Sequence, residues 1–112
     1  MNNLSTVALV TAENRKQAVA ASIQALKINP VKNKDVLIKP NFNTADETPG
    51  STHNDTLVAL VEEVWKLGAR SVSLGERSYP PTQTVMDQKG VVPLLSQHDV
   101  RILNFDELTE KD

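Results

Sequence analysis

A long polar stretch between residues 39 and 53 contains most of the residues whose side chains could bind a ligand. It follows the apolar run at 35–39 and ends where a helical pattern begins near residue 53. Connections inside compact α/β units usually take about 2–6 residues, and this one takes roughly twice that. Five residues at its beginning and end are candidate ligand-binding residues: Lys39, Asn41, Asn43, Ser51 and Thr52. A sixth candidate, Glu76, follows the next apolar run at 70–75.

These residue types are suited to holding a small anion. The ammonium of Lys39 can neutralise a negative charge, and the amides of the two asparagines can orient the ligand. Thr52 followed by Asp55 matches the capping pattern, so Thr52 is the predicted N-cap of the next helix. Unpaired amides in the first turn of a helix bind phosphate or carboxylate groups. The stretch therefore predicts an anion site.

Structural explanations of the same residues stay open. Lys39 can form an ion pair with Glu76 or Glu47 instead of contacting a ligand, and helix capping alone accounts for Thr52. The glycine-rich phosphate-binding signatures GxGxxG and GxxxxGK[ST] do not occur in the chain. The anion site is therefore a hypothesis that competes with an ordinary folded loop.

No residue pattern identifies a catalytic group or a metal site. His53 and Asp55 lie two residues apart without a third ligand in sequence, and His98 precedes the last apolar run. The chain has no cysteine, which excludes disulfides, thiolate nucleophiles and cysteine-held zinc or iron–sulfur clusters. We expect no metal and no cofactor held by this chain alone. The catalytic residues are unassigned, and the sequence does not decide whether the protein is an enzyme.

The hydrophobic period along the chain switches repeatedly between strand and helix. Apolar runs at 5–10, 35–39, 70–75 and 100–105 predict strands. Helical patterns lie at 14–29, 53–67 and 81–89, with a further turn at 91–97. Alternating strands and helices predict an α/β fold, which we expect to be a three-layer Rossmann-like sandwich. Its parallel sheet would have four strands in the order 2-1-3-4.

This fold would place the polar stretch at a ligand-binding edge. The carboxyl ends of parallel strands meet at one edge of the sheet, and ligands bind there where the strand order reverses. The loop after residue 39 and the residues after Glu76 would both emerge at this edge. The sequence therefore predicts a small anionic-ligand site at the strand ends.

Composition narrows the classes of partner. The 112 residues suit one domain, and the net charge of −2 is spread over interspersed acids and bases. A nucleic-acid partner is not expected, because such binding requires clustered Lys and Arg. No segment approaches the roughly 18 apolar residues that span a bilayer, and the polar start does not resemble a signal peptide. We expect a soluble cytoplasmic protein with no membrane partner.

The segments VLIKPNFN (36–43) and LVEEVWKLGARSVSLGERS (60–78) resemble the N-terminal half of the DUF362 family, a family named for its unknown function. The segment TVALV (6–10) and the Gly90-Val91 pair fit the same pattern. The most specific element is Lys39-Pro40-Asn41, which closes one strand, followed by Gly75-Glu76, which closes the next. The resemblance covers nearly the whole chain.

The resemblance implies that residues 1–112 form a single α/β domain that is the N-terminal fragment, or a stand-alone remnant, of a longer family member. Longer members carry a further Lys/His-containing motif, and some carry cysteine-rich ferredoxin-like modules that this chain lacks. The chain also departs from the family pattern at His53-Asn54 and at Arg77. Half of a composite active site would then be missing.

Three functions remain open at this point. The first is a ligand-binding half-domain whose anion site is completed by a missing C-terminal domain or by a second copy. The second is a non-catalytic interaction or oligomerisation domain whose long loop contacts a partner. The third is part of an iron–sulfur-associated redox protein, with the cluster held by a module outside this chain. Of these, we expect the first.

Overall fold

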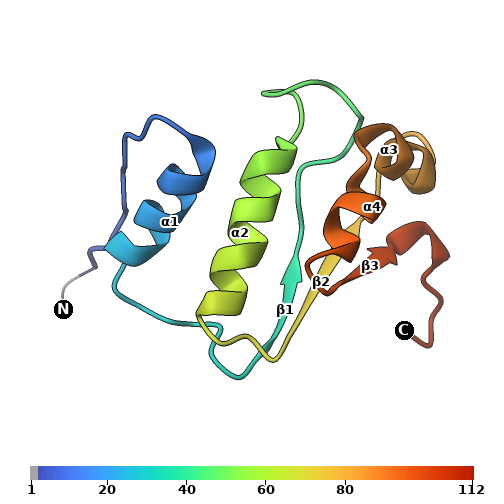
Figure 1. Cartoon of the computed structure of the whole chain (residues 1–112). Helices are drawn as coiled ribbons and strands as arrows, with labels where there is room; N and C mark the ends of the chain where they lie inside the picture. The colour runs from blue at the N-terminus through green and yellow to red at the C-terminus, as the bar shows by residue number, and fades with distance from the viewer. Residues whose placement is uncertain (1–2) are drawn as a thin grey trace.

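The computed structural model describes residues 3–112 and shows a mixed α/β fold (Figure 1). The elements follow one another in the order α1 (Arg15–Ala25), β1 (Asp35–Ile38), α2 (Asn54–Lys66), β2 (Ser71–Glu76), α3 (Thr82–Lys89), α4 (Val91–Ser96), β3 (Val100–Asn104) and a 3₁₀ turn (Phe105–Glu107). The alternation confirms the α/β class expected from the hydrophobic period. Within the described residues, no helix combines the length and the apolar character needed to cross a membrane.

The sheet is parallel and has three strands in the order β1-β2-β3. This differs from the predicted four strands in the order 2-1-3-4, because the apolar run at 5–10 forms no strand. β1 pairs directly with β2, from Asp35 opposite Ser71 to Ile38 opposite Leu74. Their direct pairing leaves no position between them for another strand, so the predicted order is wrong.

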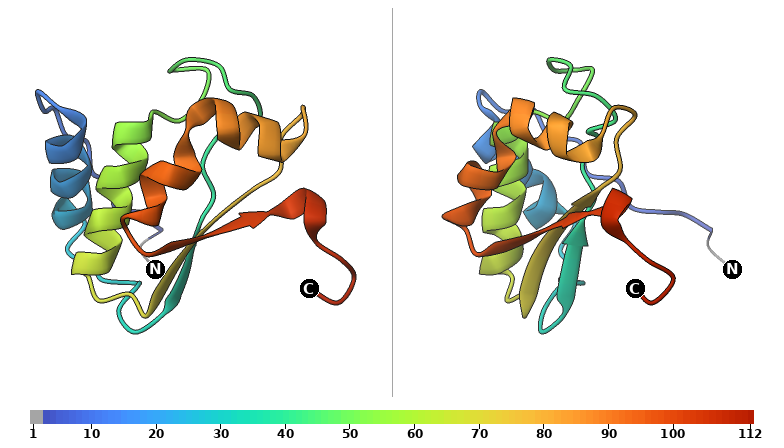
Figure 2. Two further views of the ribbon diagram at one scale, coloured as in Figure 1. Left: turned by 45° about the vertical axis from the view of Figure 1, so that its right-hand side comes forward. Right: turned by 90° about the vertical axis from the view of Figure 1, so that its right-hand side faces the viewer.

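The helices cover one face of the sheet, so the predicted three layers are not seen. In Figure 2 the helices lie to one side of the three strands, and α1, α2 and α4 form a row. Side chains that alternate toward the helices, such as Val72 and Leu74, are buried. Leu37 and Arg101 point to the other face and are exposed. The period-2 pattern of the strands therefore separates a helix-covered face from an open one.

Aliphatic side chains build the core between the sheet and the helices. The buried cluster contains Ile38, Phe42, Leu57, Val61, Val64, Val72, Leu74, Val85, Met86, Val91 and Leu95. Most members come from β1, β2 and α2, with further members from α3 and α4. Phe42 lies outside any helix or strand, yet it is fully buried. The long loop after β1 is therefore anchored in the core.

The helix ends follow local sequence signals. Asn14, where the predicted helical pattern begins, caps α1, with its side chain accepting a hydrogen bond from the Gln17 amide at 2.9 Å. The helix ends at Ala25, four residues before the predicted end at 29, and Lys27 has a positive φ of 55°. Gly90 has a φ of 65° and separates α3 from α4. The left-handed conformation at this position favours glycine.

Gly75 allows a close approach on the open face of the sheet. A Cβ atom at this position would overlap the ring of Phe105 and lie 3.1 Å from Cδ1 of Leu37. The absence of a side chain therefore lets Phe105, just after β3, pack against the backbone of β2. This contact covers the carboxyl end of β2 on the face that carries no helix.

An exposed ion pair joins the beginnings of β1 and β2. Arg70 contacts Asp35 through two hydrogen bonds, and the Ser71 hydroxyl donates a third to the same carboxylate at 2.7 Å. The bonds from Arg70, and then the bond from Ser71, hold the pKa of Asp35 well below its usual range. Because folding lowers this pKa, the interaction stabilises the fold above the pKa of the unfolded chain. Its contribution is lost as the pH falls toward the folded-state pKa.

We expect Asp35→Asn to flatten the acid side of the stability profile. Urea unfolding between pH 5 and pH 2 should show the free energy of unfolding falling less steeply in the variant than in the parent chain. Asp46→Asn is the matched control, because Asp46 is an exposed carboxylate without an ion-pair partner among residues 3–112. Equal slopes for the parent chain and Asp35→Asn would contradict the interpretation.

Candidate functional site

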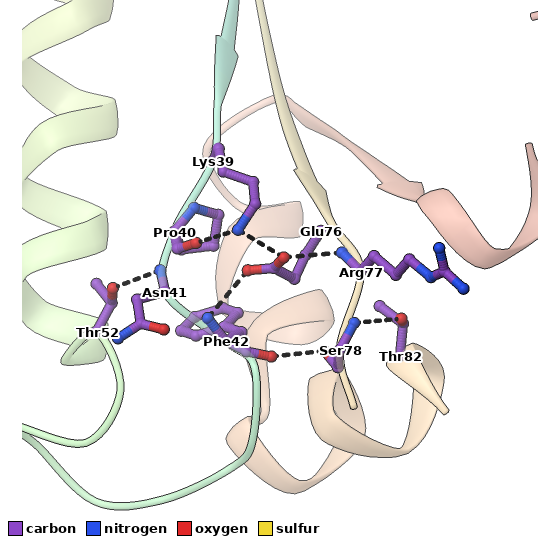
Figure 3. A network of polar contacts seen from close by, with 9 residues as sticks. All are labelled: Lys39, Pro40, Asn41, Phe42, Thr52, Glu76, Arg77, Ser78 and Thr82. Carbon is purple, nitrogen blue, oxygen red and sulfur yellow. Dashed lines mark hydrogen bonds and ion pairs between the residues drawn. The ribbon is translucent and has the colours of Figure 1, made fainter. Parts of the chain in front are cut away.

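The carboxyl ends of β1 and β2 lie side by side, and four of the six predicted residues lie around them in Figure 3, namely Lys39, Asn41, Thr52 and Glu76. Lys39 directly follows β1, and Glu76 is the last residue of β2. The loop from Lys39 to His53 leaves this edge and returns to the beginning of α2. The expectation that these segments share one edge of the sheet is met.

Glu76 is the centre of a polar network between the two strand ends. Its side chain is 1% exposed, and its Oε1 lies 2.7 Å from the Nζ of Lys39. The Arg77 amide donates to Oε1 at 2.8 Å, and the Phe42 amide donates to Oε2 at 2.9 Å. The carboxylate therefore has a partner on each oxygen, as a buried charge requires. Glu76 fastens the loop to β2.

Lys39 is part of the same network. Its ammonium donates to the Pro40 carbonyl at 2.9 Å in addition to its ion pair with Glu76. The side chain remains 58% exposed. The structural ion pair that the sequence left open as an alternative is the contact that Lys39 makes. The ammonium of Lys39 therefore has two partners within the protein, and the rest of the side chain is open to solvent.

Asn41 and Thr52 join the two ends of the loop. The Asn41 amide donates to the Thr52 hydroxyl at 2.9 Å, and the Thr52 amide donates to the Asn41 carbonyl at 3.0 Å. The Asn41 side chain donates to the Gly50 carbonyl at 3.4 Å. Asn43 is exposed, and its carbonyl accepts a hydrogen bond from the Tyr79 amide at 2.8 Å. These contacts close the loop on itself and attach it to the chain after β2.

The N-cap of α2 is His53, one residue after the predicted Thr52. The Nδ1 of His53 accepts a hydrogen bond from the Asp55 amide at 3.0 Å. Thr52 is not the cap because its hydroxyl is occupied by the Asn41 amide. Since Nδ1 of His53 is an acceptor, the neutral ring carries its proton on Nε2. In the sequence, this histidine was considered only as a metal ligand, and the structure shows that it caps α2.

Ser51 links the loop to the end of α3. Its buried hydroxyl donates to the Asp46 carbonyl and accepts a hydrogen bond from the Nζ of Lys89 at 2.7 Å. The same ammonium lies 4.9 Å from the centre of the Phe42 ring. A cation over an aromatic face is an attractive arrangement. Lys89 was not expected at the site, because nothing in its local sequence relates it to a loop that ends 36 residues earlier.

A cleft of about 460 Å³ lies beside the loop at the beginning of α2. Its lining residues are Arg15, Glu47, Thr48, His53, Asn54 and Lys89. Arg15 is exposed, with no ion pair or hydrogen bond of its side chain in the described part of the chain. Arg15 and Lys89 bring two positive charges, and Glu47 brings one negative charge. The charged side chains of the lining therefore leave one net positive charge at the cleft.

The predicted residues and the cleft are related but not identical. Ser51 contacts Lys89 and Thr52 precedes His53, so two of the six predicted residues adjoin the cleft lining. Lys39 and Glu76 make their contacts at the strand ends instead. Arg15 was missed because it begins a helix 24 residues before Lys39, and only the tertiary fold brings it to α2.

Metal chemistry has no candidate ligand set in the described residues. No group of three or more His, Asp or Glu side chains is placed to hold an ion between residues 3 and 112. The two potential ligand atoms of His53 and Asp55, Nδ1 and Oδ2, lie 3.9 Å apart. The His98 carbonyl accepts a hydrogen bond from the Trp65 indole at 2.9 Å, away from the cleft.

A family model described as "Domain of unknown function (DUF362)" matches residues 36–112. The matched range begins within β1 and includes Lys39, Glu76 and the whole loop between them. Residues 1–35, including α1 and Arg15, lie outside it. The comparisons with curated proteins and with solved structures find no match. Since the model covers more than half of the chain and includes the residues that carried the resemblance, the chain belongs to the DUF362 family.

Proposed function

We propose that this chain binds a small anionic molecule, bearing a phosphate or carboxylate group, in the cleft at the beginning of α2. The observation that carries the proposal is the convergence of Arg15, His53 and Lys89 on one cleft. Arg15 comes from α1, His53 from the loop before α2, and Lys89 from α3. The tertiary fold, and not the local sequence, therefore brings them together. A volume of about 460 Å³ suits a small ligand.

Each of the three groups has a distinct role in this proposal. Arg15 offers a planar guanidinium that can hold two oxygens of one anion. His53 donates from Nε2, because its Nδ1 caps the Asp55 amide. Lys89 contributes positive charge next to its bond with Ser51. The beginning of α2 adds a favourable dipole potential for negative charge.

The polar network at the strand ends supports the cleft. Glu76 fixes Phe42, and Phe42 lies under the Lys89 ammonium. In this proposal Lys39, Asn41, Asn43, Thr52 and Glu76 hold the loop in place, and Ser51 positions Lys89. The proposal keeps the anionic ligand expected from the sequence, but its contacts come from the cleft at the beginning of α2 and not from the strand ends. A second wall from another segment or a second copy would make the site composite.

We expect Arg15→Gln to weaken phosphate binding at least about tenfold, because a hydrogen bond to a charged group contributes about 1.5–3 kcal/mol. Isothermal titration calorimetry with inorganic phosphate, and separately with acetate, measures the dissociation constant. Arg101→Gln is the matched control, since Arg101 is exposed on β3 and does not line the cleft.

The calorimetric result separates the proposal from non-specific attraction. Equal weakening by Arg15→Gln and Arg101→Gln would show that net charge alone attracts the anion. No measurable heat with either anion would reject an anion-binding function for this cleft. Circular dichroism of both variants establishes that the fold is retained, which we expect because neither side chain has a hydrogen-bond partner in the described residues.

A further inference from the structure

The outer edge of β1 is unpaired, and an apolar segment near the start of the chain is exposed. β1 pairs with β2 on one side only among residues 3–112. Leu37, in the middle of β1, is 54% exposed. In the segment 5–10, Val7 is 84% exposed and Leu9 is 96% exposed. An open strand edge and a β-branched apolar segment are complementary, because each offers unpaired backbone groups to the other.

The position of α1 shows where a preceding strand would belong. From β1 to β3 the chain crosses the same helix-covered face twice, and each crossing moves one strand further in the same direction (Figure 1). Crossover connections between parallel strands are right-handed almost without exception. α1 packs beside α2 in the same row of helices (Figure 2). A strand that precedes α1 must therefore lie on the outer edge of β1.

The chain length between the segment and α1 fits this position. Residues 11–14 separate the segment from the first residue of α1, a length typical of a connection from a strand to a helix. Arg15 lines the cleft at the beginning of α2, so α1 begins near the edge of the sheet at which β1 ends. A parallel strand at 5–10 would end at that same edge.

We propose that residues 5–10 add to the outer edge of β1 as a fourth parallel strand, giving the order (5–10)-β1-β2-β3. α1 is the right-handed crossover helix of this unit. The addition gives Leu37 a cross-strand neighbour beside it, and it gives Val7 and Leu9 neighbours on β1. This inference does not require the anion site, because the pairing would use the outer backbone edge of β1, and no residue of β1 lines the cleft.

The segment of the same chain is the occupant that the geometry favours over a segment of a second copy. The short connection through residues 11–14 keeps the segment close to β1 of its own chain, which gives it a high effective concentration there. A second copy would have to compete with this intramolecular contact. Exchange between two copies is the alternative outcome of the experiment below.

Amide exchange by NMR on the full chain tests the proposal. We expect every second amide in 6–10 to exchange at least about tenfold more slowly than in an unstructured chain, because alternate amides of the added strand point toward β1. Nuclear Overhauser contacts should join residues 7–9 to residues 36–38. Proline cannot donate to a strand ladder, and successive amides of an edge strand point in opposite directions. Ala8→Pro or Leu9→Pro should therefore remove the protection, whereas Ala12→Pro in the connection should not.

Each outcome decides between pairing and no pairing. Exchange of 6–10 at the unstructured rate in the parent chain, with no contacts to 36–38, would overturn the proposal without requiring any variant to fold. Protection that appears only as a dimer forms, measured by light scattering across a concentration series, would overturn the intramolecular strand in favour of exchange between copies. Concentration-independent protection in a monomer supports the proposal.

Discussion

Replacing Phe42 with alanine is expected to lower the free energy of unfolding by about 3–5 kcal/mol. The ring is 0% exposed and belongs to the core cluster, although it lies in a loop. Truncation removes the buried ring, leaves a cavity and takes away the aromatic face under Lys89. Since a domain of this size is stabilised by about 5–15 kcal/mol in total, the variant should unfold at markedly lower urea concentration.

Tyr79→Ala is the matched control for this change. Tyr79 is an aromatic residue just after β2, but its side chain is 87% exposed. Its truncation should change the free energy of unfolding by no more than about 0.5 kcal/mol. If Phe42→Ala proves as mild as Tyr79→Ala, the loop is not anchored in the core. The cleft would then lack the fixed wall that the anion site requires.

Replacing Glu76 with alanine should cost about 1–4 kcal/mol of stability. The change removes the acceptor for two backbone amides and the partner of Lys39. The Phe42 amide would remain buried without an acceptor, and a buried unpaired donor costs about 1–3 kcal/mol. The remainder comes from the lost ion pair with a half-exposed lysine, which adds less.

Lys39→Gln and Glu76→Gln separate the two contributions. Lys39→Gln should cost less than Glu76→Gln, because the lysine is 58% exposed and the carboxylate is not. The double variant should cost less than the sum of the two single variants, since both belong to one network. Urea unfolding of the four proteins measures this coupling. A Glu76→Gln variant as stable as the parent chain would contradict the role given to the network.

The local elements could be predicted because their signals are local. Asn14 with Gln17 marks the beginning of α1, and the apolar runs mark β1, β2 and β3 within one or two residues. The strand order could not be predicted in the same way, because it depends on which edges pair. The run at 5–10 has the composition of a strand, but strand formation requires a partner, and the described contacts give it none in the sheet.

The candidate site was predictable only in part for a related reason. The sequence places Lys39 and Glu76 together because parallel strands end at one edge. Their ion pair was one of three contacts left open for Lys39, beside an ion pair with Glu47 and a bound anion. The observed N-cap of α2 is His53 and not the predicted Thr52, because the hydroxyl of Thr52 accepts a hydrogen bond from the Asn41 amide. Arg15 and Lys89 meet the loop only through helix packing, for which no sequence pattern exists.

The most direct test of the central claim is a phosphate titration followed by amide NMR on the full chain. The account predicts saturable shifts that are largest for residues around the cleft, at Arg15, His53, Asn54 and Lys89. Shifts at Lys39 and Glu76 should be small, because their contacts are satisfied within the protein. Shifts centred on Lys39 and Glu76, or none that saturate, would contradict the account.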